Sequence, residues 1–143
     1  MVSKVSKIED LEFYINDKIN RKSIEKKNIS IRVENSLNLF DGSADITTSI
    51  EFITREKKDL ILKEKLRMVF EGDFREYNQY QKSQNEDEKK KLIDLSVRLS
   101  IEINSTIRGI LFLKTKDYPM LSQIYLPLID EKNLRMQINE DIK

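Results

Sequence analysis

The chain of 143 residues contains neither cysteine nor histidine. Their absence excludes disulfides, thiolate nucleophiles and zinc sites built from these residues. It also removes the side chain that most often transfers protons near neutral pH. Catalysis would have to depend on carboxylates, Lys, Tyr or Ser alone. The three glycines, Gly42, Gly72 and Gly109, lie too far apart to form a phosphate-binding loop.

Two acidic runs, at 86–88 and 140–141, are the remaining candidates for paired acid–base carboxylates. Runs of neighbouring charges are more typical of a solvated face than of an acid–base pair placed in a cleft. The sequence therefore predicts no catalytic residue, no metal ligand and no cofactor, and we do not expect an enzyme.

The overall charge is balanced, with 26 basic and 25 acidic residues. This balance argues against a dominant attraction to nucleic acid or to a membrane surface. The first 30 residues lean basic, but acidic residues interleave and no nucleic-acid-binding motif is present. No segment approaches the roughly 18 apolar residues of a membrane span, and the start has no apolar signal-peptide core. We expect a cytoplasmic protein that neither binds nucleic acid nor inserts into membranes.

Alternating hydrophobicity predicts four strands in the first part of the chain. Apolar residues alternate at 11–15, occupy odd positions over 29–39, and shift to even positions over 46–54, after a turn signal at Asp41-Gly42. The clearest strand follows at 60–74. Its apolar face comprises Leu60, Leu62, Leu66, Met68, Phe70 and Phe74. Short turns between neighbouring strands indicate an antiparallel sheet with one buried and one wet face.

A long helix is predicted from about 86 to 114, where apolar residues recur at intervals of three and four. The polar segment 75–88, with Tyr77 and Tyr80 as its only large rings, predicts a surface loop that merges into the start of this helix. One apolar stripe of the helix comprises Leu92, Leu95, Leu99, Ile103, Ile107 and Ile110. A second stripe lies to the side of it and comprises Ile93, Val97, Ile101 and Leu111.

The two stripes together exceed what one contact with a sheet can bury. If the first stripe packs on the sheet, the second needs another partner, and apolar patches of that extent usually mark protein interfaces. The alternative is that the N-terminal segment or a terminal helix of the same chain covers the second stripe. The pattern favours an interface.

Two prolines, Pro119 and Pro127, exclude a continuous helix after the long one and predict an extended, apolar crossing segment. Asp130 is a suitable N-cap for a short last helix. We therefore predict one domain, 1–143, of the α+β class. Its elements are a four-stranded antiparallel sheet, a long helix, the crossing segment and a short C-terminal helix.

This layout resembles the SecB family of protein-export chaperones over about residues 10–142. Tyr118-Pro119-Met120-Leu121 is similar to the family's Phe-Pro-x-Leu element after the long helix. Pro127-Leu128-Ile129-Asp130 is similar to the Pro-Val-Asn-Phe element that leads into the last helix. The match at the level of motifs covers about 105–134.

The chain also departs from the family pattern. No proline interrupts the long helix at Ile103-Asn104-Ser105, and Ile129 stands where asparagine is common. Export chaperones of the family are acidic, whereas this chain is neutral and the wet face of its sheet carries Lys63, Lys65 and Arg67. A SecB-like relative with a different client, such as one paired with a toxin–antitoxin module, fits this charge better.

The resemblance implies a homotetramer, a dimer of dimers held by the long helices, that binds clients in apolar grooves. The second stripe would supply the assembly surface. Candidates for the groove are the side chains that a monomeric core explains least well: Phe13, Tyr14, Tyr77, Tyr118, Met120 and Tyr125. Flexible methionine and amphipathic tyrosine suit promiscuous binding, although each could equally pack in a core.

The predicted function is that of an ATP-independent holdase for unfolded or aggregation-prone polypeptides, in export or in the control of a toxin–antitoxin pair. Its partners would be unfolded clients or an antitoxin, and an exposed strand edge could pair with an extended client. The alternative is a dedicated structural or adaptor subunit that binds one protein. The two differ only in the breadth of clients.

Overall fold

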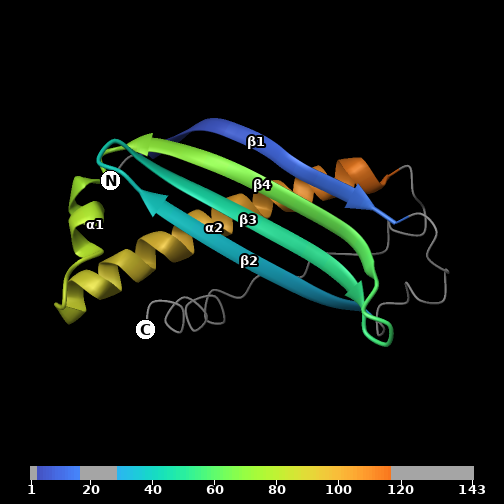
Figure 1. Cartoon of the computed structure of the whole chain (residues 1–143). Coiled ribbons are helices and arrows are strands. Elements are labelled where there is room, and N and C mark those ends of the chain that lie inside the picture. The colour runs from blue at the N-terminus through green and yellow to red at the C-terminus, as the bar shows by residue number, and fades with distance from the viewer. Residues whose placement is uncertain (1–2, 17–28, 117–143) are drawn as a thin grey trace.

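The computed structural model describes residues 3–16 and 29–116, which form a twisted antiparallel sheet with a long helix along one face (Figure 1). The elements are β1 (Ser3–Ile15), β2 (Ile29–Leu39), β3 (Ser43–Thr54), β4 (Leu60–Gly72), α1 (Arg75–Tyr80) and α2 (Glu86–Thr115). The strand order β1-β4-β3-β2 makes β1 and β2 the two edges. The predicted α+β class, a four-stranded antiparallel sheet followed by a long helix, is confirmed.

The register of the strands gathers the apolar positions on one face. In the β2–β3 hairpin, which turns at Asp41 and Gly42, Leu39 pairs with Ala44 and each odd position of β2 meets an even position of β3. Even positions of β3 also meet even positions of β4 along most of their length. Because side chains alternate between the two faces of a strand, these positions lie on the same side.

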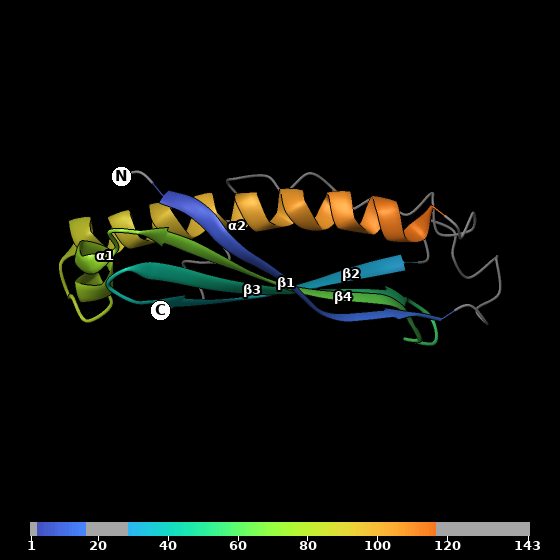
Figure 2. The same cartoon turned by 90° about the horizontal axis from the view of Figure 1, so that it is seen from above.

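The hydrophobic core fills the space between this face and α2, so the described residues form two layers (Figure 2). The central members are Ile46, Ile50, Phe52, Leu62, Leu66, Met68, Leu95, Leu99, Ile103 and Ile107. The first apolar stripe predicted for the helix therefore packs on the sheet. Its outlying members Leu92 and Ile110 are partly buried against the same cluster.

The first strand is longer than the alternation at 11–15 predicted, because β1 already begins at Ser3. Its pairing with β4 shifts register between Val5 and Lys7 and again between Asp10 and Glu12. A bulge adds one residue to one strand and so interrupts the alternation of faces. Two bulges within thirteen residues hide the period of this strand from the sequence.

The segment predicted as a surface loop contains the short helix α1, which corrects that expectation. Tyr77 of α1 holds it to the core, because its ring centroid lies 6.5 Å from that of the buried Phe74. The ring of Tyr80 meets Tyr77 edge-on, with centroids 5.9 Å apart. A helix of six residues is too short to show a helical period in the sequence.

The predicted crossing segment and terminal helix lie outside the described residues, as do Tyr118, Met120 and Tyr125. The long helix agrees with its predicted range of 86 to 114 and begins at a defined cap. The side-chain oxygen of Asn85 accepts hydrogen bonds from the backbone N–H groups of Asp87 and Glu88. Three acidic residues in the first turn add a favourable interaction with the helix dipole.

Replacing the cap residue tests whether it fixes the start of α2. We expect Asn85→Ala to lower the free energy of unfolding by about 1 kcal/mol, because two backbone donors lose their acceptor. Asn85→Asp should retain nearly all of the stability, since its carboxylate can accept the same bonds. Urea unfolding followed by circular dichroism measures both. Equal stability of the alanine variant and the wild type would show that the cap does not hold the helix start.

Candidate functional site

Edge strand β1 presents apolar side chains to solvent on the face of the sheet that bears α2. The register places Val5 opposite Phe70 and Ile8 opposite Met68, and both partners on β4 are buried. Ile8 itself is 52% exposed. Phe13 lies on the same face, opposite Glu64, and Leu11 lies at the register shift between Asp10 and Glu12. We call these four exposed residues the β1 strip: Val5, Ile8, Leu11 and Phe13.

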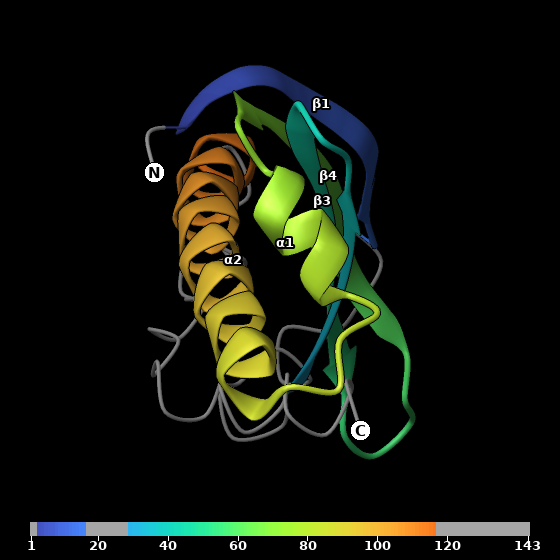
Figure 3. The ribbon, with the colours of Figure 1, turned by 90° about the vertical axis from the view of Figure 1, so that its left-hand side faces the viewer.

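The β1 strip is exposed because α2 packs on β3 and β4. Figure 3 shows α2 beside the middle of the sheet, with β1 arching along its edge. Single exposed apolar residues are common on proteins, whereas several on one strand are typical of an interaction surface.

The opposite face of the sheet is polar, and several of its charges form ion pairs with one another. The guanidinium of Arg67 donates to Asp45 at 2.5 Å and to Glu9 at 3.2 Å. Lys63 lies 3.4 Å from the carboxylate of Glu12. These pairs neutralise two of the three basic residues noted in the sequence, so this face offers a mixed polar surface and the apolar surface lies on the other side.

The outer face of α2 carries large apolar side chains that the second predicted stripe did not include. Phe112 is 73% exposed and Leu113 is exposed as well. Phe112 follows Asp94 by eighteen positions, which is five full turns, so the two share one direction from the helix axis. Because Asp94 is a charged residue that faces solvent, its alignment with Phe112 could have predicted that Phe112 is exposed.

The four residues of the second stripe do not form one continuous surface. Val97 is buried, at 2% exposure, although it lies outside the cluster packed on the sheet. Ile101 is exposed and Ile93 is half-buried. Leu111 packs within the core cluster instead of facing outward, because its position is only 40° around the helix from Ile107.

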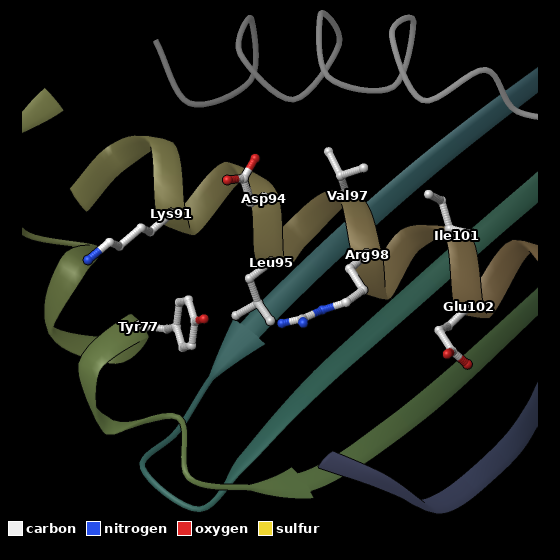
Figure 4. Close-up of a pocket in the computed structure, with 8 residues that line it drawn as sticks. All are labelled: Tyr77, Lys91, Asp94, Leu95, Val97, Arg98, Ile101 and Glu102. Carbon is white, nitrogen blue, oxygen red and sulfur yellow. The ribbon is translucent and has the colours of Figure 1, made fainter. Parts of the chain in front are cut away.

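A pocket of about 500 Å³ lies between α1 and the first half of α2 (Figure 4). Tyr77 of α1 forms one wall, and Val97 and Ile101 contribute apolar surface from α2. Leu95 and four charged side chains of alternating sign complete the lining: Lys91, Asp94, Arg98 and Glu102. This pocket thus combines residues that the sequence assigned to two different surfaces. Tyr77 was predicted for the client groove, and Val97 and Ile101 were predicted for the oligomer interface.

The described members of the predicted groove lie at opposite ends of α2. Tyr77 lines the pocket with Lys91, whereas Phe13 lies under Lys114, whose ammonium is 4.3 Å from the ring centroid. The two lysines are twenty-three residues apart, which is about 35 Å along a helix. Tyr14 is exposed on the other face of β1, opposite Lys63. Phe13, Tyr14 and Tyr77 therefore do not line a common groove.

A charged cluster joins β1, β4 and the end of α2 next to Phe13. Lys114 makes an ion pair with Asp10, and its ammonium lies 3.3 Å from a carboxylate oxygen of Glu64. Glu64 is fully buried, at an even position of β4 between Leu62 and Leu66. Its position in phase with these leucines is the signal in the sequence that would have predicted a carboxyl group inside the core.

Burial controls the ionisation of this cluster. Desolvation, followed by a hydrogen bond with Asp10, raises the pKa of Glu64 from 4.5 to about 7, against the opposing effect of Lys114. For Asp10, desolvation is outweighed by hydrogen bonds with Lys114 and Glu64, so its pKa is lowered. Protonated Glu64 therefore donates to the Asp10 carboxylate, while Lys114 neutralises that carboxylate.

Within residues 3–16 and 29–116, no three carboxylates gather closely enough to hold a metal ion. None of the helices in the described part of the chain is long and apolar enough to cross a membrane.

No known protein-family profile matches the chain, and no curated protein sequence does. Among solved structures, the chain is similar to a SecB-like chaperone of Mycobacterium tuberculosis that was solved in complex with a ChAD peptide from the HigA1 antitoxin. The TM-score is 0.53 at 9% sequence identity, and the match covers 90% of this chain and 88% of that chain. The similarity shows that the fold is SecB-like.

The raised pKa of Glu64 predicts how stability depends on pH. The folded state holds this proton more tightly than the unfolded state, so stability falls as pH rises from 4.5 to about 7 and then levels off. Glu64→Gln removes this loss. The difference in unfolding free energy between the variant and the wild type should therefore be larger at about pH 8 than at about pH 5, by on the order of 2 kcal/mol.

Urea unfolding at the two pH values provides the measurement. Glu12→Gln, which removes the same charge from an exposed ion pair with Lys63, is the matched control and should show little change. An equal response of the two variants would contradict a buried proton on Glu64.

Proposed function

We propose that the protein is a non-catalytic chaperone that holds unfolded or aggregation-prone polypeptides on the β1 strip. The observation that carries this proposal is the exposure of Ile8 and Val5 opposite buried partners on β4. These side chains continue the apolar face of the sheet past the edge of α2. An extended client segment that lies on this continuation would exclude water from both surfaces.

The SecB-like fold supports this function by analogy, and the antitoxin peptide bound by the similar mycobacterial chaperone suggests a client class. For this chain we propose an unfolded client or a segment of an antitoxin as the partner, bound without ATP. A role in a toxin–antitoxin pair fits the mixed charge of the outer sheet face, where Arg67 is paired with Asp45 and Glu9. We place the protein in the cytoplasm.

We further propose that copies of the chain assemble, ultimately into a tetramer. The charges along β1 are opposite in sign on the two sides of Ile8, with Lys4 and Lys7 before it and Glu9 and Glu12 after it. A second copy paired antiparallel about Ile8 would set each lysine opposite a glutamate. Such cross-strand pairs contribute about 0.2–1 kcal/mol each.

The outer face of α2 is the second proposed assembly surface. Ile101 is 39% exposed, and Phe112 lies further along the same side. Packing these residues against another copy would cover apolar surface that the described part of this chain leaves exposed. Ile101 retains the role that the sequence predicted for it, whereas Leu111 is already used in the core.

A dedicated adaptor that binds a single protein is the second candidate function. The pocket lined by Tyr77, Val97 and Ile101 favours it, because alternating charges around an apolar floor suit one defined partner better than many. The breadth of clients distinguishes the two candidates.

The test of the holdase function is suppression of aggregation. Wild-type protein at an equimolar ratio should suppress light scattering when urea-denatured test enzymes are diluted into buffer. Val5→Asp should bind these clients about tenfold more weakly, because a charge replaces an apolar contact in the β1 strip. Phe40→Asp is the matched control, since Phe40 is 54% exposed at the turn between β2 and β3 and is not part of the strip.

Failure of the wild type to suppress aggregation of any client would reject the holdase. Suppression confined to one protein would favour the adaptor. Equal losses in the two variants would show that apolar exposure in general, and not the β1 strip, binds clients.

Native mass by light scattering tests the assembly. We expect a wild-type mass near four chains and a smaller mass for Ile101→Glu. The pair Lys4→Glu with Lys7→Glu should also reduce the mass, because glutamates would then oppose one another across the β1 edge. Arg55→Glu with Lys57→Glu, in the exposed turn between β3 and β4, makes the same charge change and should leave the mass unchanged. A monodisperse wild-type monomer would contradict both interfaces.

A further inference from the structure

Phe13 is the one aromatic member of the β1 strip, and a cation lies over its ring. The ammonium of Lys114 lies 4.3 Å from the ring centroid and is also paired with Asp10. The same ammonium lies 3.3 and 3.4 Å from the two oxygens of Glu64. One lysine from the last turn of α2 therefore serves two carboxyl groups and covers one face of a residue in the proposed client surface.

We propose that Glu64, Lys114 and Asp10 form a proton-operated cover that determines how much of Phe13 is available to a client. The proposal rests on the proposed function, because it concerns regulation of the β1 strip. When Glu64 is protonated, Asp10 is the only anion in the cluster, and Lys114 stays between Asp10 and the ring. When Glu64 is ionised, a second and more deeply buried anion competes for the same cation.

The direction of the change follows from burial. An unpaired carboxylate in the core is far more costly than an unpaired one at the surface, because only the latter can be hydrated. Glu64 is fully buried, whereas the Asp10 side chain is 40% exposed. Ionised Glu64 therefore draws Lys114 inward, and Asp10 turns to water. The ring of Phe13 then loses its cation and becomes accessible.

The groups around Glu64 leave few other ways to compensate its charge. From β1 it is faced by Asp10, and its register partner on that strand is Phe13. From β3 its register partner is Ile50, which does not titrate. From α2 the charged neighbour is Lys114. The pKa of about 7 for Glu64 places the transition near neutral pH.

A tryptophan introduced in place of Phe13 reports on the cover without any client. The chain contains no tryptophan, so Phe13→Trp provides a single indole, the ring that binds cations most strongly. We expect its fluorescence to change with a midpoint at about pH 7. Phe13→Trp with Glu64→Gln should show no such transition, and Phe13→Trp with Glu12→Gln should keep it.

A transition that persists with Glu64→Gln, or that is absent from Phe13→Trp itself, would overturn the proposal. Should Phe13→Trp fail to fold, amide hydrogen exchange decides in its place. Wild-type residues 3–15 should then exchange faster above neutral pH, after correction for the intrinsic rate, and those of Glu64→Gln should not. Exchange that is the same in the two proteins would also overturn it.

Binding of reduced, carboxymethylated α-lactalbumin, which stays unfolded, links the cover to the client surface. Its affinity for wild type should rise about two- to fivefold between about pH 6 and about pH 8, the contribution of an exposed cation–π contact. The ratio of the two affinities should stay near one for Glu64→Gln. An indole transition without this rise would reject the regulatory role. Absence of binding at every pH alongside the transition would reject the holdase and leave the proton-operated cover in place.

Discussion

One helix cannot cover a four-stranded sheet, and the rest of the structure depends on this shortfall. With its side chains α2 is about 10 Å wide, whereas the outermost of four strands are about 14 Å apart. The helix packs on β3 and β4, so β1 lies at the margin with Ile8 exposed. The apolar surface proposed for clients is thus a consequence of how the core is closed.

The same margin explains the charged cluster. At the end of α2, the long side chain of Lys114 reaches β1 and makes an ion pair with Asp10. Glu64 lies beneath it, in the core face of β4. A buried carboxyl group beside a shared lysine stabilises this contact between α2 and the sheet less than aliphatic side chains would. It also makes the stability of the contact depend on pH.

Much of this fold could be predicted from the sequence, because β2, β3 and β4 alternate over most of their length and α2 keeps a helical period. The full length of β1 could not, since bulges at two register shifts break its alternation. Within α2, Leu111 was assigned to the second stripe but packs in the core. It projects from the helix in nearly the same direction as Ile107, which belongs to the first stripe. Glu64 was not predicted as a site residue, because the apolar residues around it on β4 dominate the alternation of the strand. Its even position nevertheless places it on the core face. Side-chain contacts between distant elements, such as Lys114 over Phe13, leave no local pattern in the sequence.

The central claim is that clients lie on β1, and hydrogen exchange measured by mass spectrometry tests it most directly. Exchange of wild-type peptides is compared with and without carboxymethylated α-lactalbumin at a fixed pH. We expect the client to slow exchange in residues 3–15, with little effect on the opposite edge strand at 29–39. Protection confined to β2, or protection around Tyr77 alone, would contradict a client surface on β1.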